Sequence, residues 1–202
     1  MIGVSSFAIK DVNFENLNDL VSLYYRSFQG SVSLSGVEES EVLEIVQDIC
    51  YRPGFIGKSI WHEDKPVGAF LAYSVSDGFG LDVDFSLLHW KLEELGLIDG
   101  IYLSKLFVDP DYHGQGLGKS LVGMLKSEHL GKPLLFRAKD KYTRESKNNT
   151  LLIVSKNYHM IPVKLFVDPK HEELVWYLVL NQFSDKLTEQ IQAYKGGDKK
   201  IC

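Results

Sequence analysis

The feature that most constrains this chain is a turn with three glycines at alternate positions, Gly114, Gly116 and Gly118. The turn follows a strand-like apolar run, residues 101–108, that ends at Asp109-Pro110, and an apolar helical pattern begins directly after it. Such a turn exposes backbone N–H groups at the positive end of a helix, where the first donors have no internal partner. Because glycine tolerates positive φ and places no side chain between ligand and backbone, a pyrophosphate fits there. The spacing predicts a strand, a diphosphate-binding turn and a helix in direct succession.

Other phosphate-binding motifs fit the same residues less well. The dinucleotide motif G-x-G-x-x-G needs glycine at the position of Lys119. The P-loop of nucleoside-triphosphate enzymes ends in G-K-[ST], which Gly118-Lys119-Ser120 supplies, but His113 stands where its leading glycine belongs. The pattern therefore leaves a nucleotide-dependent transferase as a weak alternative, and an ordinary strand-to-helix turn without a ligand as another.

Charge and composition restrict the partners that this chain is expected to have. Lys and Arg number 22 against 27 Asp and Glu, and the net charge of −5 disfavours binding to nucleic acid. With 45% hydrophobic and 24% charged residues, the composition is typical of a folded soluble protein, and no apolar run approaches the ~20 residues of a membrane helix. Cys50 and Cys202 form no metal or disulfide motif, and the first residues lack a signal-peptide pattern. We expect a cytoplasmic monomer or homodimer with no metal, no membrane contact and no nucleic-acid partner.

Hydrophobic periodicity predicts an alternating order of strands and helices. Strands are expected at residues 7–12, 58–61, 66–75, 101–108, 134–138, 160–167 and 174–180, and helices at 14–28, 40–50, 117–129 and 148–157. Residues 76–100 are expected to form an insertion with a short helix near 86–95. The order predicts an α/β fold: one domain over residues 1–182 with a mixed β-sheet flanked by helices, followed by a tail at 183–202.

One hexapeptide occurs twice in the sequence. Lys105-Leu-Phe-Val-Asp-Pro110 is repeated letter for letter at residues 164–169, but only the first copy leads into glycines. We interpret the two copies as strands that each end at a proline turn, and not as units of a repeat protein.

The segment around the glycine turn resembles the signature of the GCN5-related N-acetyltransferase (GNAT) family, which is a strand ending V-x-P followed by [RQ]-x-x-G-x-[GA] at the start of a helix. The same places here hold Val108-Asp109-Pro110 and His113-Gly114-Gln115-Gly116-Leu117-Gly118. The order of elements over residues 7–180 is also similar to that family, and the resemblance implies a GNAT-like fold with acetyl-CoA as cosubstrate. His113 departs from the signature, although a histidine can still donate a hydrogen bond.

The resemblance also implies roles for single residues. The backbone of Leu106, Phe107 and Val108 would pair with the pantetheine arm, and the amides of Gly114, Gln115, Gly116, Leu117, Gly118 and Lys119 would hold the pyrophosphate. Asn149, or its neighbour Asn148, corresponds to an asparagine on a helix of the family. Tyr158 is expected to act as the general acid that protonates the leaving thiolate, with packing at a helix end as its alternative role. Ser104 stands where many relatives carry an acid, and could hold a water that acts as the base.

Together these features predict an N-acetyltransferase that moves an acetyl group from acetyl-CoA to a primary amine by direct attack in a ternary complex. No covalent enzyme intermediate is required. The usual acid and base residues of the family are missing at their places, so the alternative is a CoA-binding module without turnover that acts as a sensor or interaction protein. The acceptor stays open among small amines, antibiotics, polyamines, amino acids and proteins.

Overall fold

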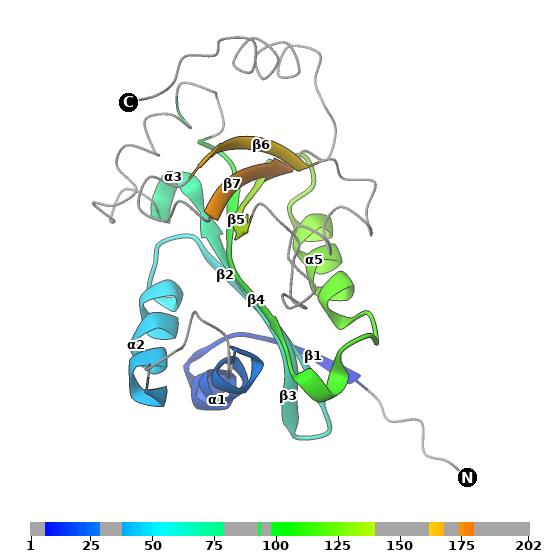
Figure 1. Cartoon of the computed structure of the whole chain (residues 1–202). Coiled ribbons are helices and arrows are strands. Elements are labelled where there is room, and N and C mark those ends of the chain that lie inside the picture. Colours follow the sequence, from blue (N-terminus) through cyan, green and yellow to red (C-terminus); the bar gives the residue numbers. More distant parts are fainter. Residues whose placement is uncertain are drawn as a thin grey trace.

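The computed structural model of the chain describes residues 7–28, 38–78, 93, 98–139, 162–167 and 174–179 (Figure 1). The described strands form a seven-stranded sheet in the order β1-β2-β3-β4-β5-β7-β6. They are β1 (Phe7–Asp11), β2 (Phe55–His62), β3 (Lys65–Ser74), β4 (Ile101–Val108), β5 (Leu134–Lys139), β6 (Pro162–Val167) and β7 (Leu174–Val179). Neighbouring strands are antiparallel except β4 and β5, which are parallel.

The described helices cover both faces of this sheet. They are α1 (Leu17–Phe28), α2 (Glu39–Cys50), the short α3 (Val75–Gly78) and α5 (Leu117–Glu128), with the 3-10 turns η1 (Phe14–Asn16) and η5 (Pro110–Tyr112). Figure 1 shows α1 and α2 on one side of the sheet and α5 on the other. The predicted class, a mixed sheet flanked by helices, is confirmed.

Each face of the sheet carries its own apolar core. On the first face, Leu20 and Leu23 of α1 and Val42 and Val46 of α2 are fully buried. Against the other face, α5 packs Leu121, Val122 and Leu125. Apolar residues recur at intervals of three and four along these helices, so each helix presents one apolar stripe to the sheet. The face of β4 that contacts α1 is called here the α1 face, and the opposite one the α5 face.

Hydrogen bonds set the starts of two helices. The predicted helix over 14–28 begins as a 3-10 turn because the Asn13 side chain accepts hydrogen bonds from the N–H groups of Glu15 and Asn16. At α2, the Glu41 carboxylate accepts a hydrogen bond from the N–H of Glu38 at 2.8 Å. Both arrangements satisfy N–H donors that helix geometry leaves unpaired.

The strand β2 begins earlier than the sequence pattern indicates. The predicted start was residue 58, but the pairing with β3 extends back to Phe55, which lies opposite Tyr73. Gly57 is part of this extension, and a Cβ atom there would come within 2.8 Å of the Val12 Cβ. A strand held by its neighbour tolerates a glycine that weakens the local pattern. At the other end of the hairpin, β3 stops at Ser74, and Val75 begins α3 where the sequence predicted a strand residue.

Several predicted segments fall outside the described residues. They are most of the insertion at 76–100, the helix at 148–157 and the tail at 183–202. The strand predicted at 160–167 is described from Pro162, so the first four residues of each copy of the hexapeptide lie on a strand, and the second proline turn lies outside the described residues. Within the described ranges, no helix has the length and apolar character needed to cross a membrane.

We predict that Leu121→Ala lowers the free energy of unfolding by about 2–5 kcal/mol, the usual cost of truncating a buried leucine. Leu121 is 0% exposed and holds α5 against β3. Urea denaturation measures the change. Ile9→Ala is the matched control, because Ile9 is 57% exposed and its truncation should change stability by no more than about 0.5 kcal/mol. Equal losses in the two variants would contradict the assigned core.

Candidate functional site

The strand β4 pairs with its two neighbours over different lengths. Its antiparallel ladder with β3 continues to Val108, opposite Gly68, whereas its parallel ladder with β5 stops at Leu103, opposite Phe136. From residue 104 to 108, the edge of β4 that faces β5 therefore has no strand partner among the described residues. Unpaired N–H and C=O groups along such an edge can bind an extended ligand that has amide groups of its own.

A β-bulge lies where β4 leaves β5. Leu71 of β3 pairs with Lys105 and Ala72 pairs with Leu103, so Ser104 is the extra residue on β4. Ser104 is half-buried at this position. A bulge changes the direction of the side chains around it, which makes it common beside active sites. Ser104 thus lies on the predicted strand, at the residue where β4 separates from β5.

The glycine turn has the backbone geometry that its sequence predicts. Gly114 and Gly116 both have φ of +81°, a left-handed conformation that other residues adopt only with strain. A Cβ atom at either position would meet no atom within 4 Å. Gly116 is the N-cap of α5, and as a glycine it has no side chain that could accept hydrogen bonds from the first N–H groups of the helix. An open turn at the start of a helix, called the cradle below, is the kind of place where proteins bind anions.

A buried carboxylate fixes the start of the turn. The Asp109 side chain is 4% exposed and lies 3.4 Å from an Arg26 nitrogen of α1 and 3.7 Å from the Lys65 nitrogen of β3. Its other oxygen accepts a hydrogen bond from the N–H of Asp111 at 3.1 Å. These contacts hold the end of β4 to both α1 and the β2–β3 hairpin, so the turn leaves the sheet in one direction.

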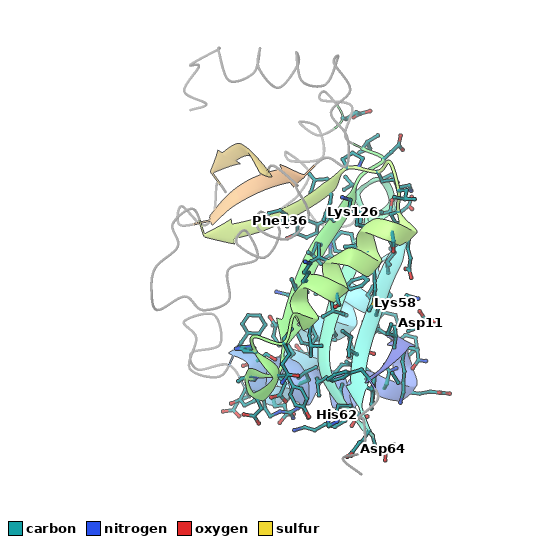
Figure 2. The ribbon with its side chains drawn as sticks, turned by 90° about the vertical axis from the view of Figure 1, so that its right-hand side faces the viewer. Asp11, Lys58, His62, Asp64, Lys126 and Phe136 are labelled. Atoms are coloured by element: carbon teal, nitrogen blue, oxygen red, sulfur yellow. The ribbon has the colours of Figure 1, made fainter. Side chains whose placement is uncertain are left out.

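Two histidines provide further anchors for the turn. His113 Nε2 donates a hydrogen bond to the Val108 carbonyl at 3.0 Å. His62 Nδ1 and the Tyr112 hydroxyl share a hydrogen bond of 2.7 Å, and the ring of Phe7 lies 5.4 Å from that of His62. Figure 2 shows His62 and Asp64 at the end of the sheet where β2 turns into β3. His113, predicted as a ligand to the cofactor, is thus also an internal link between the turn and the strand before it.

The structure brings most predicted binding residues into one continuous track. Leu106, Phe107 and Val108 lie on the unpaired stretch of β4, and the track continues through the turn from Gly114 to Lys119. Tyr158 and Asn149, predicted from the resemblance, lie outside the described residues. Sequence reasoning did not find the residues that anchor the turn, because their contacts join segments far apart in the chain. For Tyr112 and Asp109 the sequence offered one signal, because both residues come directly before the glycine turn.

Cys50 is not an activated nucleophile in this structure. Burial raises the pKa of its thiol to about 11, so the thiol is protonated at neutral pH. A protonated thiol attacks an acyl group poorly. The aromatic side chains of Trp61, Phe70 and Tyr73 are at most 4% exposed and belong to the packed interior.

Comparisons with known proteins decide the family. The model of the acetyltransferase (GNAT) family matches residues 17–136, which is more than half of the 202 residues. The chain belongs to the GNAT family. The match spans α1 to β5. It includes the stretch of β4 that is not paired with β5, the bulge at Ser104 and the glycine turn. No curated protein matches the chain.

Solved structures support the same fold. An acetyltransferase from Thermus thermophilus is similar with a TM-score of 0.58 at 17% identity, covering 89% of this chain and 100% of its own. The PaiA N-acetyltransferase from Thermoplasma acidophilum, solved with coenzyme A, gives 0.54 at 10% identity, covering 87% and 99%. The ribosomal-protein-S18-alanine N-acetyltransferase from Escherichia coli gives 0.54 at 12% identity, covering 89% and 97%. The GNAT fold supports an acyl-CoA-dependent acetyltransferase in general.

We predict that Gly116→Ala weakens CoA binding about tenfold or more, because its Cβ would enter the space proposed for the diphosphate. The left-handed φ adds a strain of about 1–2 kcal/mol, which lowers the stability of the variant. Gly131→Ala is the matched control, because Gly131 has φ of +84° and equally open surroundings but lies after α5. Isothermal titration with CoA and thermal unfolding measure both variants. We expect equal stability losses but a loss of affinity only in Gly116→Ala, and unchanged affinity there would exclude the turn as the binding site.

We predict that Tyr112→Phe weakens CoA binding by about 2–10-fold, since a net hydrogen bond contributes about 0.5–1.5 kcal/mol. The variant loses the link to His62 that holds the turn against the hairpin. Tyr51→Phe is the control, because Tyr51 is 68% exposed and stacks on Phe14 far along the chain from the turn. The same titration applies. An affinity loss of similar size in both variants would argue against a specific anchor.

Proposed function

We propose that this GNAT protein transfers an acetyl group from acetyl-CoA to a primary amine by direct attack in a ternary complex. The observation that carries the proposal is the continuity of the track: an unpaired strand edge at residues 104–108 leads directly into a glycine cradle at the start of α5. The first part suits the amide groups of a pantetheine arm and the second suits a pyrophosphate. Acetyl-CoA would need both the unpaired strand edge and the glycine cradle, and in this chain only a short turn joins the two.

The binding roles follow from this track. Leu106 and Val108 would offer backbone N–H and C=O groups to the arm, together with Phe107 between them. The amides from Gly114 to Lys119 would hold the diphosphate, and Asn149 is proposed to contact the cofactor from the helix predicted at 148–157. None of these roles needs a cluster of basic side chains, which agrees with the net charge of −5.

The chemistry needs a proton acceptor and a proton donor beside the thioester. Acetyl-CoA would supply an acyl group activated as a thioester, whose carbon–sulfur bond is exchanged for a carbon–nitrogen bond to the acceptor. Ser104, at the bulge, is proposed to hold the water that takes the proton released by the amine. Tyr158 is proposed to donate a proton to the departing sulfur. A protonated Cys50 supports direct attack over an acyl-enzyme at that thiol.

A second candidate is a CoA-binding module without turnover. Ser104 favours it, because a hydroxyl cannot take a proton unaided and no carboxylate stands at the bulge. In either case we propose a cytoplasmic protein whose domain covers residues 1–182.

We predict that acetyl-CoA and CoA raise the midpoint of thermal unfolding, and that thiol is released from acetyl-CoA only when an amine is present. The rate should rise with pH, because only the deprotonated amine can attack. Tyr158→Phe should lower kcat about 100-fold with unchanged CoA affinity, within the usual range for general acid catalysis. Tyr51→Phe serves as the control for a tyrosine outside the site. Stabilisation without amine-dependent thiol release would establish the module instead, and no stabilisation by either ligand would refute both candidates.

A further inference from the structure

The main-chain groups of Leu106 and Val108 point to the unpaired edge of β4. At the end of the strand, the N–H of Asp109 donates a hydrogen bond to the Val67 carbonyl of β3 at 2.9 Å. In an antiparallel pair, every second residue directs its N–H and C=O groups to the partner strand, and the residues between direct theirs away from it. Counting back from Asp109, Val108 and Leu106 therefore direct these groups to the side where β5 has separated.

The ring of His113 already bonds one of these groups. Its Nε2 lies 3.0 Å from the carbonyl oxygen of Val108. A carbonyl only accepts hydrogen bonds, so Nε2 carries the proton and donates it. A pantetheine arm that pairs with β4 would bring an amide N–H to about the same distance from the same oxygen. The ring therefore stands at the end of the unpaired edge, in the place where the proposed arm would bond.

The ring of His113 can leave this place without disturbing the backbone of the turn. The side chain is exposed, so the ring is hydrated after it rotates outward. The backbone has hydrogen bonds of its own, since the N–H of Tyr112 donates to the Asp109 carbonyl at 2.9 Å. The N–H of His113 likewise donates to the Pro110 carbonyl at 3.2 Å. A rotation of the His113 side chain thus frees the edge of β4 and leaves these bonds in place.

We propose that His113 and the pantetheine arm compete for the Val108 carbonyl, so that the ring swings off β4 when the complete cofactor binds. This inference rests on the proposed function. The bond from His113 then has opposite effects on the two parts of the ligand, because it holds the turn in shape for the diphosphate but opposes the arm. His113 thereby sets the preference between ligands that carry an arm and ligands that do not.

The test compares ADP with dephospho-CoA, because the second ligand adds a pantetheine arm to the first. Titration calorimetry measures the Kd of dephospho-CoA, and displacement of bound CoA measures the weaker Kd of ADP. His113→Ala should weaken ADP binding, because the turn loses an anchor. It should weaken dephospho-CoA binding less, or strengthen it, because the arm no longer displaces the ring. We expect the ratio of the Kd for ADP to the Kd for dephospho-CoA to rise about 2–10-fold, the range of one net hydrogen bond.

Two further variants distinguish the hydrogen bond from a general effect on the fold. His113→Gln keeps an N–H donor for the Val108 carbonyl and should return the ratio toward its wild-type value. His129→Ala is the matched control, because it removes a half-buried histidine at the other end of α5 and should leave the ratio unchanged. Thermal unfolding confirms that each variant is folded.

The outcomes separate this inference from the proposed function. If dephospho-CoA binds the wild type and His113→Ala changes both Kd values by the same factor, the ring only anchors the turn, and the inference is wrong while the proposed function stands. A larger loss for dephospho-CoA than for ADP would make His113 a ligand to the arm and would also overturn the inference. If ADP does not displace CoA, the Kd for dephospho-CoA decides alone: tighter binding in His113→Ala supports the inference and weaker binding contradicts it. If neither CoA nor dephospho-CoA binds the folded wild type, the proposed function itself is refuted.

Discussion

The unequal pairing of β4 is the constraint on which the rest of this structure depends. Held by β3 along its length but by β5 only as far as Leu103, the strand keeps a fixed position while one of its edges stays unpaired among the described residues. Backbone polar groups that are removed from water need partners, so such an edge is stable when exposed to solvent or when a ligand supplies the missing bonds. An extended ligand with amides meets that need without any specific side chain. The cofactor role proposed for this edge therefore depends on backbone groups more than on particular side chains.

Several side-chain contacts anchor the glycine turn that we propose as the diphosphate site. Two glycines at φ of +81° give the turn its shape but also add backbone freedom that would be lost when a ligand binds. Asp109, buried between α1 and the β2–β3 hairpin, and the bonds of His62 to Tyr112 and of His113 to Val108 reduce that freedom before binding. A preorganised turn loses less entropy on binding. His113 departs from the family signature, and its ring links the turn to the strand before it.

The sequence predicted the order of elements and the glycine turn because both rest on local patterns. Apolar spacing indicated the helices over 17–28 and 117–128 to within a few residues, and Gly114 and Gly116 indicated the left-handed turn. The bulge at Ser104 could not be predicted in this way, since it appears only when β4 is aligned with β3. The same holds for the pairs Arg26–Asp109 and His62–Tyr112, whose members lie 83 and 50 residues apart. What depends on contact across the sheet needs the structure.

The repeated hexapeptide shows why local sequence alone does not make this site. Residues 105–110 and 164–169 are identical, and both begin within strands of one sheet. Each copy also lies at a register shift, with Ser104 unpaired on β4 and Leu165 unpaired on β6. Yet β4 lies beside β5, which diverges from it, and the first copy is followed by the glycine turn. The second copy starts on β6, the edge strand of the described sheet, and is followed in sequence by Lys170-His171-Glu172. Only the first copy leads into glycines at the start of a helix, so only that copy is proposed to bind the cofactor.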